Sequence, residues 1–157
     1  MAIQATPVTS NRPPWDCIQP VRAFATPITT SATNTATSAA QVTGLTLTPP
    51  TMGSLVQYVR VNLTGDSVSN SGANNVIITL WLGTVGTGTQ LASTSATAQS
   101  GALAPLDVHW MIPATSTYGL APGSSYTFNI GMHGSGAGTN TMTAASTSPI
   151  LYSVEYL

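Results

Sequence analysis

The chain has 157 residues, of which only 4% are charged, and its formal net charge is −1 at pH 7. It contains 26 Thr, 17 Ser and no Lys. This composition argues against nucleic-acid binding, which needs a basic surface to neutralise phosphates. Average hydrophobicity with almost no charge predicts one folded domain rather than a disordered chain. No apolar run reaches the roughly 18 residues of a membrane-spanning helix, so we expect no membrane partner.

The first 40 residues differ from the rest of the chain. Their prolines restrict the backbone to extended conformations, and residues 29–40, TTSATNTATSAA, are of low complexity. We predict that residues 1–40 form an extended, proline-rich anchoring arm and linker, and that residues 41–157 form the body. The N-terminal MAIQATPVTS lacks the charged and apolar regions of a secretory signal, so we expect synthesis in a cytoplasm.

From Gln41 onward, short alternating runs are separated by Gly, Pro, Asn and Ser, which is typical of an all-β fold. The predicted strands are 42–49, 55–63, 76–83, 89–96, 106–112, 125–132, 141–146 and 149–157. Eight strands without an amphipathic helix predict an eight-stranded, jelly-roll-like β-sandwich. An immunoglobulin-like sandwich is the alternative topology.

Two predicted strands carry apolar side chains on the face opposite to their core positions. We therefore predict an oligomer interface at Ile77, Trp81, His109 and Met111. A second small core is the alternative reading of the same residues.

Few residues in the chain are suited to catalysis. Asp107 and His109 are two positions apart on one predicted strand, so they share a face. The pair could orient a base or begin a metal site, but no third ligand is evident, and a polar interface pair explains it more simply. The glycine-rich stretches at 83–90 and 131–140 predict hairpin loops, because a phosphate-binding Walker loop requires a Lys. We expect no catalytic residue, metal or other cofactor; a depolymerase would need paired carboxylates across a cleft.

The segment NRPPWDCIQPVRAF, residues 11–24, combines charged, aromatic and apolar residues in an otherwise neutral chain. Cys17 has Asp16 beside it, which disfavours a reactive thiolate, so we interpret it as a packing residue. We predict that the segment binds a partner through Arg12, Trp15, Asp16, Cys17, Ile18, Val21, Arg22 and Phe24.

Two stretches carry a family resemblance. LAPGSSYTFNIGMHG at 120–134, followed by SPILYSVEYL at 148–157, resembles the closing hairpin of jelly-roll modules on tailed-bacteriophage virions. The stretch 74–93, NNVIITLWLGTVGTGTQLAS, is similar to the central strand and hairpin of those modules. The resemblance covers residues 41–157 in pattern.

The resemblance implies a homotrimer that is located on the virion and assembled in the host cytoplasm. It implies a capsid decoration (cement) protein that binds the major capsid protein or another virion protein through its arm. The alternative is a tail-fibre or head-fibre tip that binds host glycan through exposed aromatic residues such as Tyr118 or Trp81.

Overall fold

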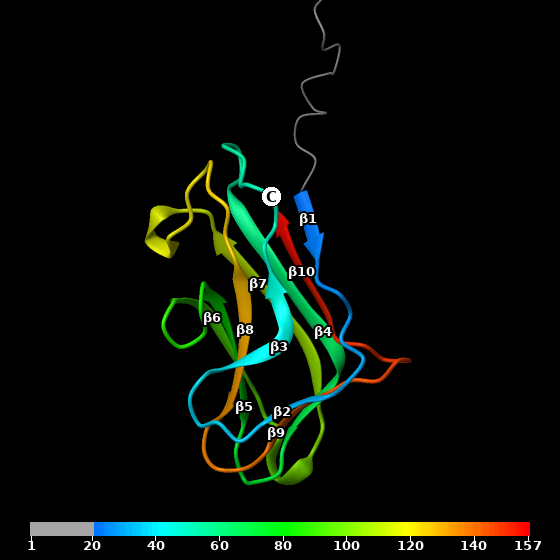
Figure 1. Cartoon of the computed structure of the whole chain (residues 1–157). Helices are drawn as coiled ribbons and strands as arrows, with labels where there is room; N and C mark the ends of the chain where they lie inside the picture. Colours follow the sequence, from blue (N-terminus) through cyan, green and yellow to red (C-terminus); the bar gives the residue numbers. More distant parts are fainter. Residues whose placement is uncertain (1–20) are drawn as a thin grey trace, which may run out of the picture.

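The structure is a computed structural model and describes residues 21–157. The predictions for Arg12, Trp15, Asp16, Cys17 and Ile18 lie outside the described residues. Within residues 21–157 the chain forms ten strands and two 3-10 helices (Figure 1). The strands are β1 Val21–Phe24, β2 Ala32–Asn34, β3 Ala40–Leu47, β4 Tyr58–Asn70, β5 Val76–Leu82, β6 Thr89–Ala96, β7 Ala104–Pro113, β8 Phe128–Gly134, β9 Asn140–Thr143 and β10 Leu151–Tyr156. The helices are η2 Gln99–Gly101 and η3 Ser116–Tyr118, and neither they nor any other helix within residues 21–157 is long and apolar enough to cross a membrane.

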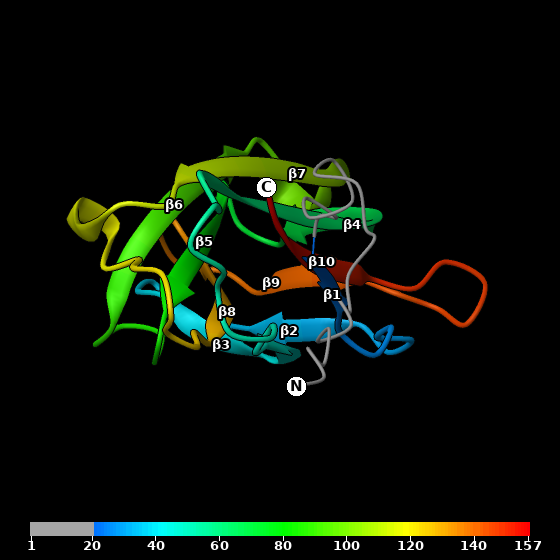
Figure 2. The same ribbon diagram turned by 90° about the horizontal axis from the view of Figure 1, so that it is seen from above.

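The strands form two antiparallel sheets that face each other. The six-stranded sheet has the order β1-β10-β4-β9-β2, and β7 pairs with the other edge of the long strand β4. The four-stranded sheet has the order β3-β8-β5-β6. Figure 2 shows β4 and β7 on one side of the molecule and β3 and β8 on the other. The fold is therefore an all-β sandwich, as the sequence predicts.

The pairing of the strands is nested. The first long-range pair is β1 with β10, and inside it lie β3 with β8, β4 with β7 and β5 with β6. A long hairpin rolled up in this way produces the two sheets of a jelly roll. An immunoglobulin-like sandwich instead pairs its first two strands with each other. The nested order confirms the jelly-roll prediction, with the short strands β2 and β9 added to one sheet.

The core lies between the sheets and is built from the inward positions of the alternating runs. Alternation places every second side chain of a strand on one face. The inward positions that are buried in the structure include Val59, Val61, Leu63, Val76, Ile78, Leu80, Phe128, Ile130, Met132, Ile150, Tyr152, Val154 and Tyr156. Burial of such apolar surface, at roughly 25 cal/mol per Å², is the main force that holds the sheets together.

The sandwich begins earlier in the chain than the predicted boundary. Val21–Phe24 pairs with β10, and Ala32–Asn34 pairs with β9, so residues 21–40 belong to the sandwich rather than to a separate arm and linker. The extended backbone that favours an arm also suits a strand at a sheet edge. Such short edge strands need little apolar alternation, because their partners bury most of the core surface.

Candidate interface on the outer face of the six-stranded sheet

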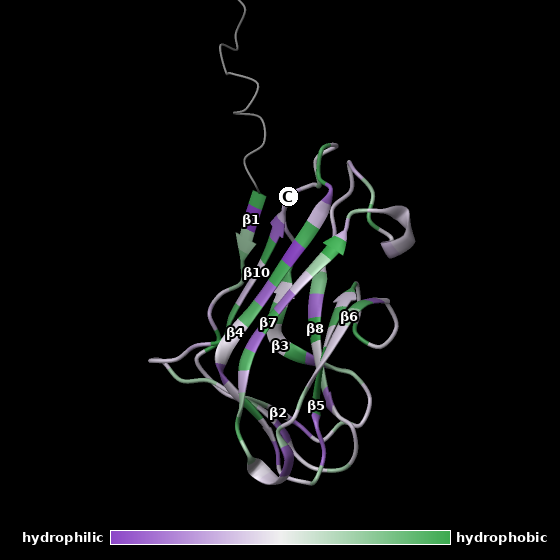
Figure 3. Ribbon diagram, turned by 180° about the vertical axis from the view of Figure 1, so that it is seen from behind, coloured by the Kyte–Doolittle hydropathy of each residue, from purple (hydrophilic) through white to green (hydrophobic). Residues whose placement is uncertain are grey.

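Four adjacent strands, β1, β10, β4 and β7, form a regular outer surface that we call the sheet face (Figure 3). Antiparallel partners lie directly opposite one another and point to the same side of a sheet, so the register arranges the outer side chains in rows. The first row is Arg22, Glu155, Arg60 and Met111. The second row is Phe24, Ser153, Asn62 and His109. The third row is Leu151, Thr64 and Asp107.

A buried carboxylate holds the first row together. Arg22 Nη2 donates to Glu155 Oε2 at 2.9 Å, Arg60 Nε donates to the same oxygen at 2.8 Å, and Arg60 Nη2 also donates to it. Burial of Glu155 by itself would raise its pKa, but the hydrogen bonds and positive charges of the two arginines outweigh this effect and hold the pKa below its usual value. The carboxylate is therefore ionised and fixed in place at neutral pH.

A chain of polar contacts crosses the second row. Asn62 Nδ2 donates to Ser153 Oγ at 3.3 Å, and Asn62 Oδ1 lies 2.7 Å from His109 Nδ1. His109 Nε2 lies 2.8 Å from Asp107 Oδ1. Both ring nitrogens thus face oxygen atoms of neighbouring side chains. Within residues 21–157 no group of three His, Cys, Asp or Glu side chains gathers around this pair in a metal-binding arrangement.

Exposed apolar side chains accompany these polar groups. Seven large apolar residues are exposed within residues 21–157, and four of them, Phe24, Tyr58, Met111 and Leu151, lie on the sheet face. A hollow of about 420 Å³ lies beside Phe24. It is lined by Phe24, Ala25, Pro27, Asn62, Thr64, Leu151, Tyr152 and Ser153. Exposed aromatic and Met side chains, together with Arg, are enriched at protein interfaces.

The predicted oligomer residues do not form one surface. His109 and Met111 lie on the sheet face, but Ile77 and Trp81 point outward from β5, which belongs to the four-stranded sheet. Alternation along one strand identifies its outer face but not the sheet that the strand joins. The four-residue interface predicted from sequence is therefore divided between two opposite faces.

Trp81 is largely covered by its own chain. It is only 9% exposed, and its indole N–H donates to Thr79 Oγ1 at 2.9 Å. The side chain of Val85, in the loop after β5, and Trp81 both approach Gly131 closely, so this loop folds over the outer side of the four-stranded sheet. The position of Trp81 therefore fits the alternative prediction, a second small core, better than the prediction of an exposed oligomer interface.

The structure brings two of the predicted arm residues onto the sheet face. Arg22 and Phe24 share it with His109 and Met111, and the Arg22 guanidinium carbon lies 5.7 Å from the centre of the Phe24 ring. Val21 is opposite Tyr156, so it points toward the other side of the sheet. The sequence analysis did not identify Arg60, Asn62, Leu151 and Glu155 as residues of this face. A charged or large apolar residue at an outward position of a predicted strand is the sequence signal that could have identified such residues.

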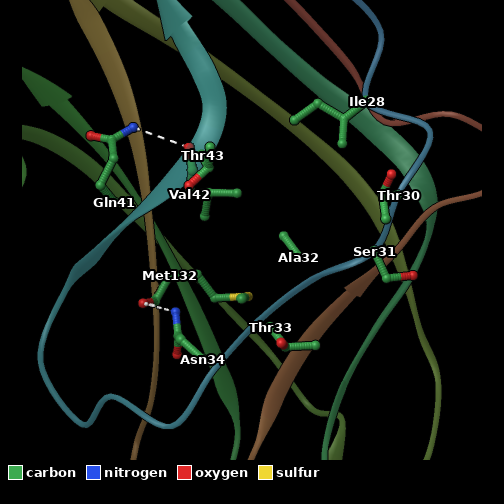
Figure 4. A pocket seen from close by; sticks show the side chains of 10 residues that line it. All are labelled: Ile28, Thr30, Ser31, Ala32, Thr33, Asn34, Gln41, Val42, Thr43 and Met132. Carbon is green, nitrogen blue, oxygen red and sulfur yellow. Dashed lines mark hydrogen bonds between the residues drawn. The ribbon is translucent and has the colours of Figure 1, made fainter.

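A second hollow, of about 340 Å³, opens at the edge of the sandwich between β2 and β3 (Figure 4). These two strands belong to different sheets. Val42, Ala32 and Met132 point into the hollow, and Thr30 and Ser31 lie at its far end. Among residues 21–157, no charged side chain lines this hollow. The sheet face differs from it in having charged groups.

No protein-family model matches the chain, and no curated protein matches it. A solved structure to which the chain has a distant likeness is titled "Structure of infectious bursal disease virus Gx strain". The TM-score is 0.42 and the sequence identity is 13%, over 88% of this chain and 36% of the other. The chain thus spans about a third of the length of the protein it matches, and we base no functional argument on so distant a likeness.

Proposed function

We propose that this protein is a non-enzymatic structural protein of a virus particle, and that it decorates and stabilises the capsid of a tailed bacteriophage. One observation carries the proposal. Four of the five charged residues within residues 21–157 lie on the sheet face, together with Phe24 and Met111, although the chain as a whole is almost uncharged. Such a concentration of charged and exposed apolar groups on one face supports a protein-binding role. The jelly-roll fold, frequent in viral capsid proteins, and the sequence resemblance are consistent with it.

The chemistry of the sheet face also supports a binding role rather than catalysis. The carboxylate of Glu155 accepts hydrogen bonds from two arginines. His109 Nε2 lies 2.8 Å from Asp107 Oδ1, so these two side chains contact each other. In the proposed function, these groups orient a protein partner and no bond in a substrate is made or broken. We propose that residues 1–20, which precede the edge strand β1 of the sheet face, anchor the protein to the major capsid protein.

Binding to capsids that lack the protein tests this function. We expect the full chain to co-sediment with such capsids, and a chain without residues 1–20 to lose most of its binding. A variant with residues 1–20 in shuffled order is the control, because it keeps their length and composition. Failure of the full chain to bind capsids would overturn the proposed function. Full occupancy by the truncated chain would instead overturn the anchoring role of residues 1–20.

Glycan binding is the second candidate function, and the hollow beside Phe24 favours it. The exposed Phe24 ring forms one wall, and the polar groups of Asn62 and Ser153 lie along the same hollow. An aromatic ring beside amide and hydroxyl groups suits the apolar face and the hydroxyl edge of a sugar. A glycan array on which the full chain binds, and on which Phe24→Ser does not, would support this alternative; an array without binding would remove it.

A further inference from the structure

We propose that the sheet face binds the sheet face of a second copy of this chain in a two-fold symmetric pair, with the strands of the two copies running in opposite directions. This inference rests on the proposed structural function, because it names the partner of the same face. The distribution of charged and apolar groups over the three rows indicates that the partner is a second copy of the chain.

The two ends of the sheet face expose opposite charges. At the first row, the side chains of Arg22 and Arg60 are 42% and 37% exposed, while the Glu155 carboxylate between them is buried. At the third row, the Asp107 side chain is 65% exposed. Met111 and Asp107 mark the two rows on β7 and are four residues apart, which corresponds to about 13 Å along a strand. The positive and negative ends of the face are therefore about 13 Å apart, which is farther than one side chain extends.

A two-fold axis that lies between the copies, perpendicular to the strands, brings each positive end over the negative end of the other copy. A contact between Arg60 of one copy and Asp107 of the other then occurs twice, as an isologous interface requires. The same two faces stacked with their strands parallel would place like charges over each other, which is unfavourable. The charge pattern therefore selects one orientation for the pair.

The apolar groups supply the contact area. From Tyr58 to Thr64 the face is roughly 20 Å long, and its four strands are roughly 19 Å wide. Burial of this surface on both copies gives about 760 Å² in total, which is in the range of weak, transient interfaces rather than stable ones. Phe24 stands at one edge of the face beside its hollow, and it is 66% exposed. We expect a dissociation constant in the micromolar range.

Sedimentation velocity of the full chain, from about 1 to 100 μM, tests the inference. We expect a monomer–dimer equilibrium, and a dissociation constant that rises at least about tenfold in Phe24→Ser and in Asp107→Arg. Leu103→Ser is the matched control, because Leu103 is 69% exposed but lies outside the rows of the sheet face. Asp107→Arg alters an exposed side chain only, so it remains informative if Phe24→Ser disturbs folding.

Three results would overturn the inference. One is a chain that remains monomeric over the whole concentration range, and another is a closed trimer without a dimer. The third is a dissociation constant that does not change in Phe24→Ser and Asp107→Arg, or that rises as much in the control Leu103→Ser as in those two variants. A monomer that still binds capsids would reject this pairing and leave the proposed function standing, so the two failures are distinguishable.

Discussion

At the scale of single residues, Glu155 connects three strands of the sheet face. It is buried on β10 and accepts hydrogen bonds from Arg22 on β1 and Arg60 on β4. A carboxylate in this position depends on both arginines, because a buried charge without partners is strongly unfavourable. The same contacts cover the negative charge and leave the two partly exposed guanidinium groups to define the positive end of the face.

The lowered pKa of Glu155 predicts a loss of stability in acid. An ionised Glu155 favours the folded state, so its contribution is complete above the unfolded pKa, about 4.3, and is lost as pH falls through the lower folded pKa. We expect Glu155→Gln to reduce the free energy of unfolding at pH 7 by about 1 to 2 kcal/mol. We expect the difference from the unchanged chain to shrink below about pH 4.

Denaturant unfolding between pH 7 and pH 3 measures this effect. Asp66→Asn is the control, because Asp66 is exposed and its replacement removes the same charge. Equal pH dependence in the unchanged chain and in Glu155→Gln would show that Glu155 does not couple folding to protonation.

The tyrosines of β10 predict the opposite behaviour in alkali. Burial raises the pKa of Tyr156 to about 12, and its hydroxyl has no hydrogen-bond partner among the described residues. The neutral phenol favours the folded state, so stability is complete below the unfolded pKa, about 10, and declines as pH rises toward the folded value. We expect Tyr156→Phe to preserve or increase stability at pH 7, because it removes an unsatisfied buried hydroxyl.

Thermal unfolding at pH 7 and pH 11 checks this prediction, with Tyr58→Phe as the matched control on an exposed tyrosine. Tyr156→Phe should lose less stability than the unchanged chain between the two pH values. A marked destabilisation by Tyr156→Phe at pH 7 would mean that the hydroxyl makes a stabilising contact.

At the scale of elements, β1 and β2 decide where the folded body begins. β1 closes one edge of the six-stranded sheet and supplies Arg22 to Glu155, and β2 pairs with β9. The body therefore depends on residues that precede the low-complexity stretch at 29–40 as well as on those within it.

Two truncations test this boundary. Removal of residues 1–20 should change the melting temperature by less than about 2 °C, because it removes none of the described strands. Removal of residues 1–34 should lower it by about 10 °C or more, because it removes β1 and β2 and leaves Glu155 with one arginine. Equal melting temperatures for the two truncated chains, measured by circular dichroism, would contradict the assignment of residues 21–34 to the body.

Sequence patterns predicted the elements with strong alternation and missed those without it. The predicted strand 89–96 coincides with β6. The predicted strands 55–63, 76–83, 125–132 and 149–157 overlap β4, β5, β8 and β10, because burial of one face imposes a period of two on the sequence. β1 and β2 were missed because short edge strands carry no such period. The sheet face could not be predicted as a unit, since Glu155, Arg60 and Arg22 meet only through the pairing register.

At the scale of the whole molecule, the charge distribution distinguishes the two outer faces of the sandwich. The sheet face contains Arg22, Arg60, Asp107 and Glu155, whereas the opposite face is partly covered by its own loop over Trp81. A nearly neutral chain with one charged and apolar face suits a subunit of an assembly, because low net charge also favours association. The proposed capsid role and the proposed pairing both follow from this asymmetry.

The position of the protein on virus particles tests the central claim most directly. Intact virus particles whose genome encodes this chain are labelled with gold-conjugated antibodies against residues 21–157. Electron microscopy then shows where on the particle the protein lies. The proposed function predicts dense label over the capsid shell. Label confined to a tail or fibre tip, or particles without label that contain no copy of the chain by mass spectrometry, would contradict it.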